Sequence, residues 1–231
     1  PPRSTPKPSS AASDVYKRQA LGIVAALLET KNSGKGQVID AAMTDGSSLL
    51  MTMMYSMHQS GFWNLERQTN LLDGAAHFYD TYECKDGKYI SLGSIEPQFY
   101  ALLCEKAELS QDDFGDQMKR DTWQNKKQMI KNVFLTKTRE EWCDLMEGSD
   151  VCFAPVLDMS EAPMHPHNIA RQTFIEIEGV TQPAPAPRFD RTQNEITLPP
   201  AIAGEHSKEI LESIGIDSNE YDRLISSGSV A

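Results

Sequence analysis

The chain has 231 residues, which is long enough for one large domain or two small ones with a buried core. It carries 22 basic and 33 acidic side chains, and the formal charge of −11 argues against non-specific binding to nucleic acids or anionic membranes. Hydrophobic residues at 39% and charged residues at 24% are typical of a soluble globular protein. No run approaches the roughly 18–20 apolar residues that a membrane span needs.

The four cysteines indicate neither a metal site nor a disulfide framework. Cys84, Cys104, Cys143 and Cys152 form no CxxC pair, and no histidine lies at metal-ligand spacing from them. The sequence shows no signal-peptide pattern, and we expect none. We therefore expect no metal ion and a reducing compartment, either the cytoplasm or, in a eukaryote, the mitochondrial or peroxisomal matrix.

The first 19 residues are polar and rich in Pro and Ser, as in a disordered terminus. Back-translation of Ser9–Gln19 gives a string that resembles a transposon adapter used in sequencing libraries, and Pro1–Thr5 fits the flow-cell adapter upstream of it. We expect residues 1–19 to be a disordered, translated artefact, and the natural sequence to begin at Ala20, within a longer protein. Without the four basic and one acidic side chains of this stretch, 18 basic and 32 acidic groups remain, a formal charge of −14.

The remaining chain alternates between predicted helices and short strands. Helical spacing, capping signals and terminal glycines predict helices at 20–30, at 43–60, from Pro97, through Trp123–Phe134, after a capping box at Thr138–Glu141, and at 207–214 and 219–225. Strands are predicted at 37–40, 78–82, 89–92 and 151–157, with a hairpin turn at Lys85–Lys88. Alternating prolines predict an extended linker at Gln182–Arg188.

Few residues indicate chemistry on their own, because the sequence has no P-loop, GxGxxG or GxSxG motif. Glu96 precedes Pro97 at a predicted helix N-terminus, where the helix dipole favours a carboxylate. It is either a structural cap or a catalytic group. The methionines of 51–57 are either core residues or an adaptable surface for an acyl chain.

Several segments, in order, resemble the family III CoA-transferases. The similarity begins with Gly34–Met43 followed by Asp45-Gly46, and Ala154–Val156 and Gly204–His206 fit later parts of the family pattern. Three segments resemble the α-methylacyl-CoA racemase branch, namely Asn70–Ala75, Phe78–Tyr82 and Gly93–Tyr100. His77 departs from that branch, which usually has Pro there, and it is either a pocket residue or structural.

The resemblance implies an α/β fold of the family III CoA-transferase type. Residues 20–60 would be the end of a Rossmann-like large domain and a linking helix, and 61–187 a small α+β domain. Residues 188–231 would return to the large domain, of which only remnants are present. In the family two chains interlock as a homodimer, and each active site forms between the large domain of one and the small domain of the other.

The resemblance further implies racemisation of 2-methylacyl-CoA thioesters by 1,1-proton transfer through an enolate, with no cofactor beyond the coenzyme A of the substrate. The family's principal His and Asp precede the segment matching Ala20, so we expect the fragment to be inactive and to expose apolar surface. Glu96 would lie in the active site beside that His and help to orient it. Substrate-binding residues are expected at Leu72, Tyr79 and Ile95 around the chiral centre and at Asp73, Gly74 and Ala75 in the adjoining loop, with plain core packing as the alternative for Leu72 and Ile95.

Two other functions stay open. A CoA transferase of the same family would use an aspartate nucleophile and a mixed anhydride. A non-enzymatic acidic interaction domain is the third possibility. In every case we expect no nucleic-acid or membrane partner.

Overall fold

The structure is a computed structural model that describes residues 10–196 and 198–230, with side chains from residue 16 onward. By its internal contacts the chain divides into two units, Pro1–Val156 and Leu157–Ala231. From the sequence we expect the small domain to end at residue 187. The division by contacts instead assigns residues 157–187 to the second unit. Among the described residues, no helix combines the length and apolar character needed to cross a membrane.

Three helices open the first unit: α1 (Ser10–Ser33), α2 (Met43–Leu50) and α3 (Thr52–Gln59). Residues 10–19, for which the sequence predicts disorder, are helical, while 1–9 lie outside the described residues. The predicted single helix over 43–60 is two helices, because Met51 donates its N–H to the carbonyl of Ser48, three residues back, and tightens the turn there.

The strand predicted at 37–40 does not form. This segment is irregular and pairs with no other strand among the described residues, and the Val38 side chain is 95% exposed. A short apolar run needs a neighbouring strand to satisfy its backbone.

The first three helices leave much apolar surface uncovered. The exposed side chains of this surface include Leu21, Val24, Leu27, Leu28, Leu49, Leu50, Met51, Met53 and Tyr55. The exposed apolar surface expected of the fragment is therefore present, and Met51 and Met53 do not belong to a core within this chain.

A three-stranded antiparallel sheet follows, with strand order β1-β2-β3. β1 (Tyr79–Glu83) and β2 (Tyr89–Gly93) form the predicted hairpin, whose turn holds Gly87 at φ +75°. β3 (Phe153–Val156) is shorter than predicted and pairs with β2, so that Ser91 lies opposite Ala154.

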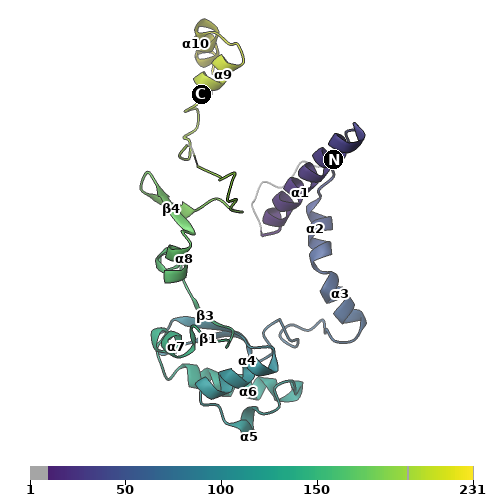
Figure 1. Cartoon of the computed structure of the whole chain (residues 1–231), viewed down its shortest axis with the longest axis vertical. Helices are drawn as coiled ribbons and strands as arrows, with labels where there is room; N and C mark the ends of the chain where they lie inside the picture. Colours follow the sequence, from purple (N-terminus) through teal and green to yellow (C-terminus); the bar gives the residue numbers. More distant parts are fainter. Residues whose placement is uncertain (1–9, 197, 231) are drawn as a thin grey trace. The chain divides into compact units, whose positions relative to one another are not determined.

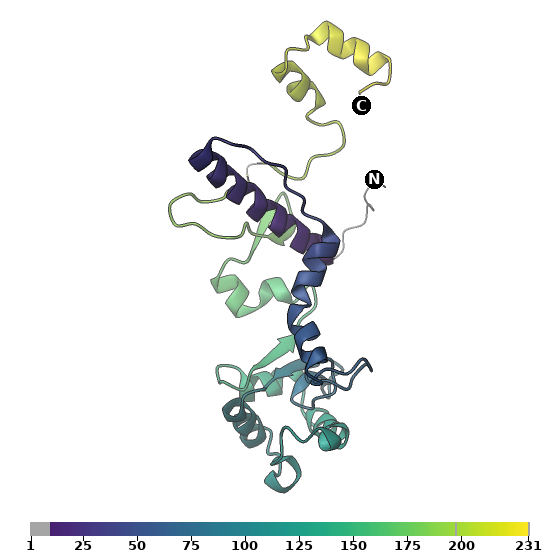
Figure 2. The ribbon, with the colours of Figure 1, turned by 90° about the vertical axis from the view of Figure 1, so that its right-hand side faces the viewer.

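Most of the helices of this part lie below the sheet in the view of Figure 1, and Figure 2 shows the same part turned by 90°. The helices of this part are α4 (Pro97–Lys106), α5 (Gln111–Phe114), η1 (Arg120–Thr122), α6 (Trp123–Phe134) and α7 (Arg139–Met146). The predicted capping box is confirmed: Thr138 N–H donates to the Glu141 carboxylate at 2.7 Å, and the Glu141 N–H donates back to the Thr138 hydroxyl at 3.3 Å.

The core of the first unit lies between the sheet and α4, α6 and α7, and large aromatic rings fill it. Phe78 meets Trp123 edge to face with centroids 5.8 Å apart, and Phe134 meets Trp142 in the same way at 4.9 Å. Each tryptophan also satisfies its N–H within the core, since Trp142 donates to the Phe134 carbonyl at 2.9 Å and Trp123 to the Gln117 carbonyl at 2.8 Å.

The second unit contains short elements: η2 (Ala162–Met164), α8 (Pro166–Ala170), β4 (Phe174–Ile177), β5 (Val180–Pro183), α9 (Ser207–Ser213) and α10 (Ser218–Ser226). β4 and β5 form an antiparallel hairpin. The linker predicted at Gln182–Arg188 is wrong at its start, because Gln182 and Pro183 pair with Ile175 and Phe174. The two predicted terminal helices are confirmed as α9 and α10.

Candidate functional site

A pocket of about 560 Å³ lies beside the sheet of the first unit. Three segments distant in sequence line it: the loop ending at Gly74, the facing parts of β1 and β2, and the start of β3. The structure therefore brings together four of the residues expected to bind substrate, Leu72, Asp73, Gly74 and Tyr79.

Asp73 is held by hydrogen bonds within its own loop. Its carboxylate accepts from the backbone N–H of Asn70 at 2.8 Å and from the Asn70 side-chain amide at 2.7 Å. Burial acts to raise the pKa of Asp73, but the hydrogen bonds from Asn70 and from the backbone of Thr69 and Gln68 together outweigh it, and the pKa is lowered. Asp73 thus shapes the loop as a carboxylate, a role unlike that of a base.

Lys127 connects this loop to the sheet. From α6 its ammonium group donates to the carbonyl of Gly74 and forms an ion pair with Asp80 on β1. Gly74 has φ +94°, a conformation that favours glycine. The position of the loop relative to β1 is therefore set by one side chain of α6.

The pocket has apolar walls, and Gly93 leaves space in it because glycine has no side chain. Leu72, Tyr79 and Phe153 supply apolar surface. A Cβ atom added at Gly93 would lie 3.7 Å from the Cys152 carbonyl oxygen and 3.8 Å from a ring carbon of Tyr79, which is ordinary contact. Gly93 therefore keeps open a space that a methyl group would fill.

Glu96 stands at the N-terminus of α4, directly before Pro97, and its exposed side chain makes no capping hydrogen bond. Its negative charge acts on Cys152. Burial raises the pKa of the Cys152 thiol, and the charges of Glu96 and Asp150 raise it further. Cys152 lines the pocket, so the charge of Glu96 acts on a side chain of the pocket wall.

Ala75 and Ile95 do not line the pocket. Ala75 is in the hydrophobic core, and Ile95 is half-buried and packs against that core. Of the two residues for which core packing was the alternative, Leu72 lies at the pocket and Ile95 on the core.

His77 is fully buried. Its Nε2 lies 2.7 Å from the hydroxyl oxygen of Tyr100, and that hydroxyl donates to the Phe114 carbonyl at 2.9 Å. Nε2 therefore carries the proton, and Nδ1 has no hydrogen-bond partner among the described residues. Burial, followed by the charge of Lys126, lowers the pKa of His77 to about 3. His77 is therefore a core histidine, and it does not line the pocket.

Sequence reasoning missed the contribution of β3 and its preceding residue. Cys152, Phe153 and Ala154 line the pocket opposite the loop, and Ser91 lines it from β2. Two signals were available, the strand predicted at 151–157 and the similarity of Ala154–Val156 to a family segment, but neither indicates that this strand pairs with β2.

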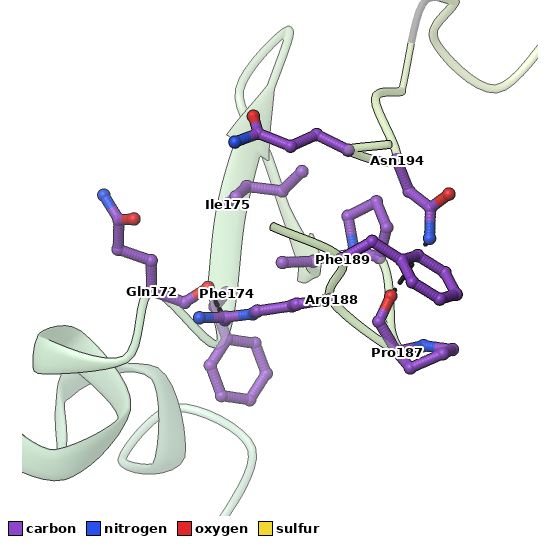
Figure 3. A pocket seen from close by; sticks show the side chains of 10 residues that line it. Gln172, Phe174, Ile175, Pro187, Arg188, Phe189 and Asn194 are labelled. Carbon is purple, nitrogen blue, oxygen red and sulfur yellow. Dashed lines mark hydrogen bonds between the residues drawn. The ribbon is translucent and has the colours of Figure 1, made fainter. Parts of the chain in front are cut away.

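A second pocket, of about 430 Å³, lies in the second unit between β4 and the segment after β5 (Figure 3). Arg188 extends along Phe174 and donates to the Gln172 carbonyl at 2.7 Å, while Asn194 donates to the Pro187 carbonyl at 3.0 Å. These polar groups hold the loop itself. None of the predicted site residues lines this pocket.

Within the described residues no group of three or more His, Cys, Asp or Glu side chains is placed to hold a metal ion.

The chain is similar to known proteins over most of its length. The α-methylacyl-CoA racemases of Mus musculus and Homo sapiens are each 40% identical to this chain, over 90% and 91% of it and over 56% and 57% of their own lengths. The chain thus spans a little over half the length of these curated relatives. A crystal structure of Rv3272 from M. tuberculosis shares the fold with a TM-score of 0.66 at 20% identity, covering 90% of this chain and 57% of that one. Residues 18–207 match the sequence model of CoA-transferase family III, and the chain belongs to that family.

Proposed function

We propose that the protein containing this chain racemises 2-methylacyl-CoA thioesters by moving a proton at the α-carbon. The observation that carries the proposal is the pocket, which gathers Leu72, Asp73, Gly74 and Tyr79 from two separate segments that resemble the racemase branch. The likeness to the two mammalian racemases supports the same activity.

The chemistry needs an apolar pocket near a pair of acid and base groups. An α-proton beside a thioester is weakly acidic, so one group must remove it while another returns a proton on the opposite face. Leu72, Tyr79 and Phe153 would hold the methyl-branched carbon chain. Excluding water there would strengthen the interactions that stabilise the enolate oxygen.

Glu96 would act as the carboxylate that orients a catalytic histidine supplied from outside this chain. Its exposure and its place at the N-terminus of α4 support this role, because a carboxylate is favoured there and its side chain does not cap the helix. The raised pKa of the Cys152 thiol argues against nucleophilic catalysis by this cysteine, because the thiolate is the nucleophile.

The intact protein is proposed to work as a homodimer in the cytoplasm, or in a mitochondrial or peroxisomal matrix. The exposed apolar residues of α1–α3 support the presence of further packing partners. We also propose that residues 20–231 alone are inactive, since the principal His and Asp of the family would precede them.

The test is incorporation of solvent deuterium at the α-carbon of a 2-methylacyl-CoA, followed by mass spectrometry. The protein is prepared once with its upstream segment and once as residues 20–231. Exchange by the longer protein and none by residues 20–231 is the expected result. Exchange by residues 20–231 alone would show that the proposed division of the catalytic groups is wrong.

A CoA transferase is the second candidate, because the family as a whole carries that name. In that case the longer protein would transfer CoA between two carboxylic acids and would not exchange the α-proton. If the longer protein shows neither α-proton exchange nor CoA transfer, a non-enzymatic interaction domain would be favoured.

A further inference from the structure

We propose that Gln117 is a positioning residue for Glu96, an inference that rests on the function proposed for Glu96 above. Gln117 lies in the turn between α5 and η1 and is almost fully buried, with 8% of its surface exposed. It is not part of the pocket lining. Its contacts are with the backbone that leads into Glu96.

One amide group satisfies two consecutive carbonyls. The Nε2 atom of Gln117 donates to the carbonyl oxygens of Ser94 and of Ile95, each at 2.9 Å. Because both acceptors are oxygens, the nitrogen of the amide must face them, and this fixes the orientation of the side chain. These are the last two carbonyls before Glu96, so the amide fixes the direction from which the chain enters α4.

The same short segment is also held by two residues that lie just before β1 and β3. The hydroxyl of Ser94 donates to the Val151 carbonyl, and the N–H of Ser94 donates to the Phe78 carbonyl at 3.1 Å. Residue 151 directly precedes Cys152 of the pocket. Gln117 therefore completes a set of hydrogen bonds to residues 94 and 95, and this set fixes the position of the neighbouring Glu96 relative to the pocket.

Gln117 is itself held by α6. The Trp123 indole N–H donates to the Gln117 carbonyl at 2.8 Å, and the buried Lys126 donates from Nζ to the neighbouring Asp116 carbonyl at 2.7 Å. Because the backbone at Gln117 is held by these two hydrogen bonds, its side chain has little freedom and can hold a second group in place.

The test compares Gln117→Met with Gln128→Met in the protein with its upstream segment. The first change keeps the volume and removes both donors, leaving two carbonyls without partners. The second makes the same chemical change at an exposed position of α6. Both are measured by α-deuterium exchange, alone and combined with Glu96→Gln. Trp123→Phe, which removes the N–H and keeps an aromatic ring, serves as a milder variant if Gln117→Met does not fold.

We expect Gln117→Met to lower kcat by about 10- to 100-fold with little change in KM, and Trp123→Phe to do so by a smaller factor. In the Glu96→Gln background Gln117→Met should add little, because the group that it positions is already lost. Gln128→Met should leave the rate unchanged. Equal losses from Gln117→Met in both backgrounds would overturn the inference and leave the proposed function standing. No exchange by the unsubstituted protein would overturn the proposed function itself, and full activity of Glu96→Gln would overturn the role of both residues.

Discussion

Lys127 on α6 and Asp80 on β1 form an ion pair at the edge of the pocket, with 24% of each side chain exposed. The same ammonium group also binds the carbonyl of Gly74. A single lysine thus connects a helix, a strand and the loop that carries Leu72 and Asp73. Partial burial protects the pair from screening by salt better than a pair on the open surface.

Lys127→Met should lower the free energy of unfolding by about 1 kcal/mol, because it removes the ion pair and the hydrogen bond to Gly74. Urea unfolding followed by the fluorescence of the buried Trp123 and Trp142 measures this change. Lys131→Met, at an exposed position of the same helix, is the control and should have a smaller effect. Equal losses from the two variants would contradict the bridging role of Lys127.

His77 should make stability depend on pH. The folded state depresses the pKa of His77 from 6.5 to about 3, so between these values the unfolded chain binds the proton and the folded chain does not. The contribution of neutral His77 to the free energy of unfolding is complete above pH 6.5 and is lost as the pH falls toward 3. The free energy of unfolding changes through this group by at most about 1.4 kcal/mol per pH unit.

His77→Leu should flatten the dependence of the unfolding free energy on pH between 4 and 6, measured by urea unfolding at each pH. His58→Leu, at an exposed histidine, should keep the slope of the unsubstituted chain. If the slopes of all three proteins coincide, His77 is not a neutral buried group.

Thr138→Ala should destabilise the first unit by about 1 kcal/mol, because the threonine hydroxyl that accepts from the Glu141 N–H and caps the helix is lost. Thr138→Ser retains the hydroxyl that accepts from Glu141, and it should retain most of the stability. Urea midpoints of the two variants give the comparison. The prediction fails if serine and alanine are equally destabilising.

Gly93→Ala should reduce activity while leaving the fold intact. The added methyl group makes only ordinary contacts with the Cys152 carbonyl and Tyr79, so the free energy of unfolding should change by no more than about 0.5 kcal/mol. It fills pocket space, however, and a methylene-sized change in an apolar pocket lowers kcat/KM about 10-fold or more.

Gly87→Ala is the matched control for this variant. Gly87 has φ +75° in the hairpin turn, so alanine there should cost about 1 kcal/mol of stability. Its α-deuterium exchange rate should be unchanged. Full activity of Gly93→Ala would remove the pocket from consideration as the substrate site.

Local signals were sufficient for the elements that depend on nearby residues. The hairpin at Lys85–Lys88 and the cap at Thr138 are set within a few residues, and both are confirmed. The strand at 37–40 is wrong because a strand also needs a partner, which the local sequence does not specify. The lining of the pocket shows the same limit, because Phe153 and Ala154 reach it through the pairing of β3 with β2, about 60 residues away in the sequence.

Helix α6 holds the site from two directions, through Trp123 and Lys126 to the turn at 116–117 and through Lys127 to Gly74 and Asp80. The loop and the entry to α4 are therefore parts of one cooperative unit with this helix, and neither should open independently. Amide hydrogen exchange in both segments should accelerate together when α6 frays. A ligand or substitution far from the pocket could then disable it by loosening this one helix.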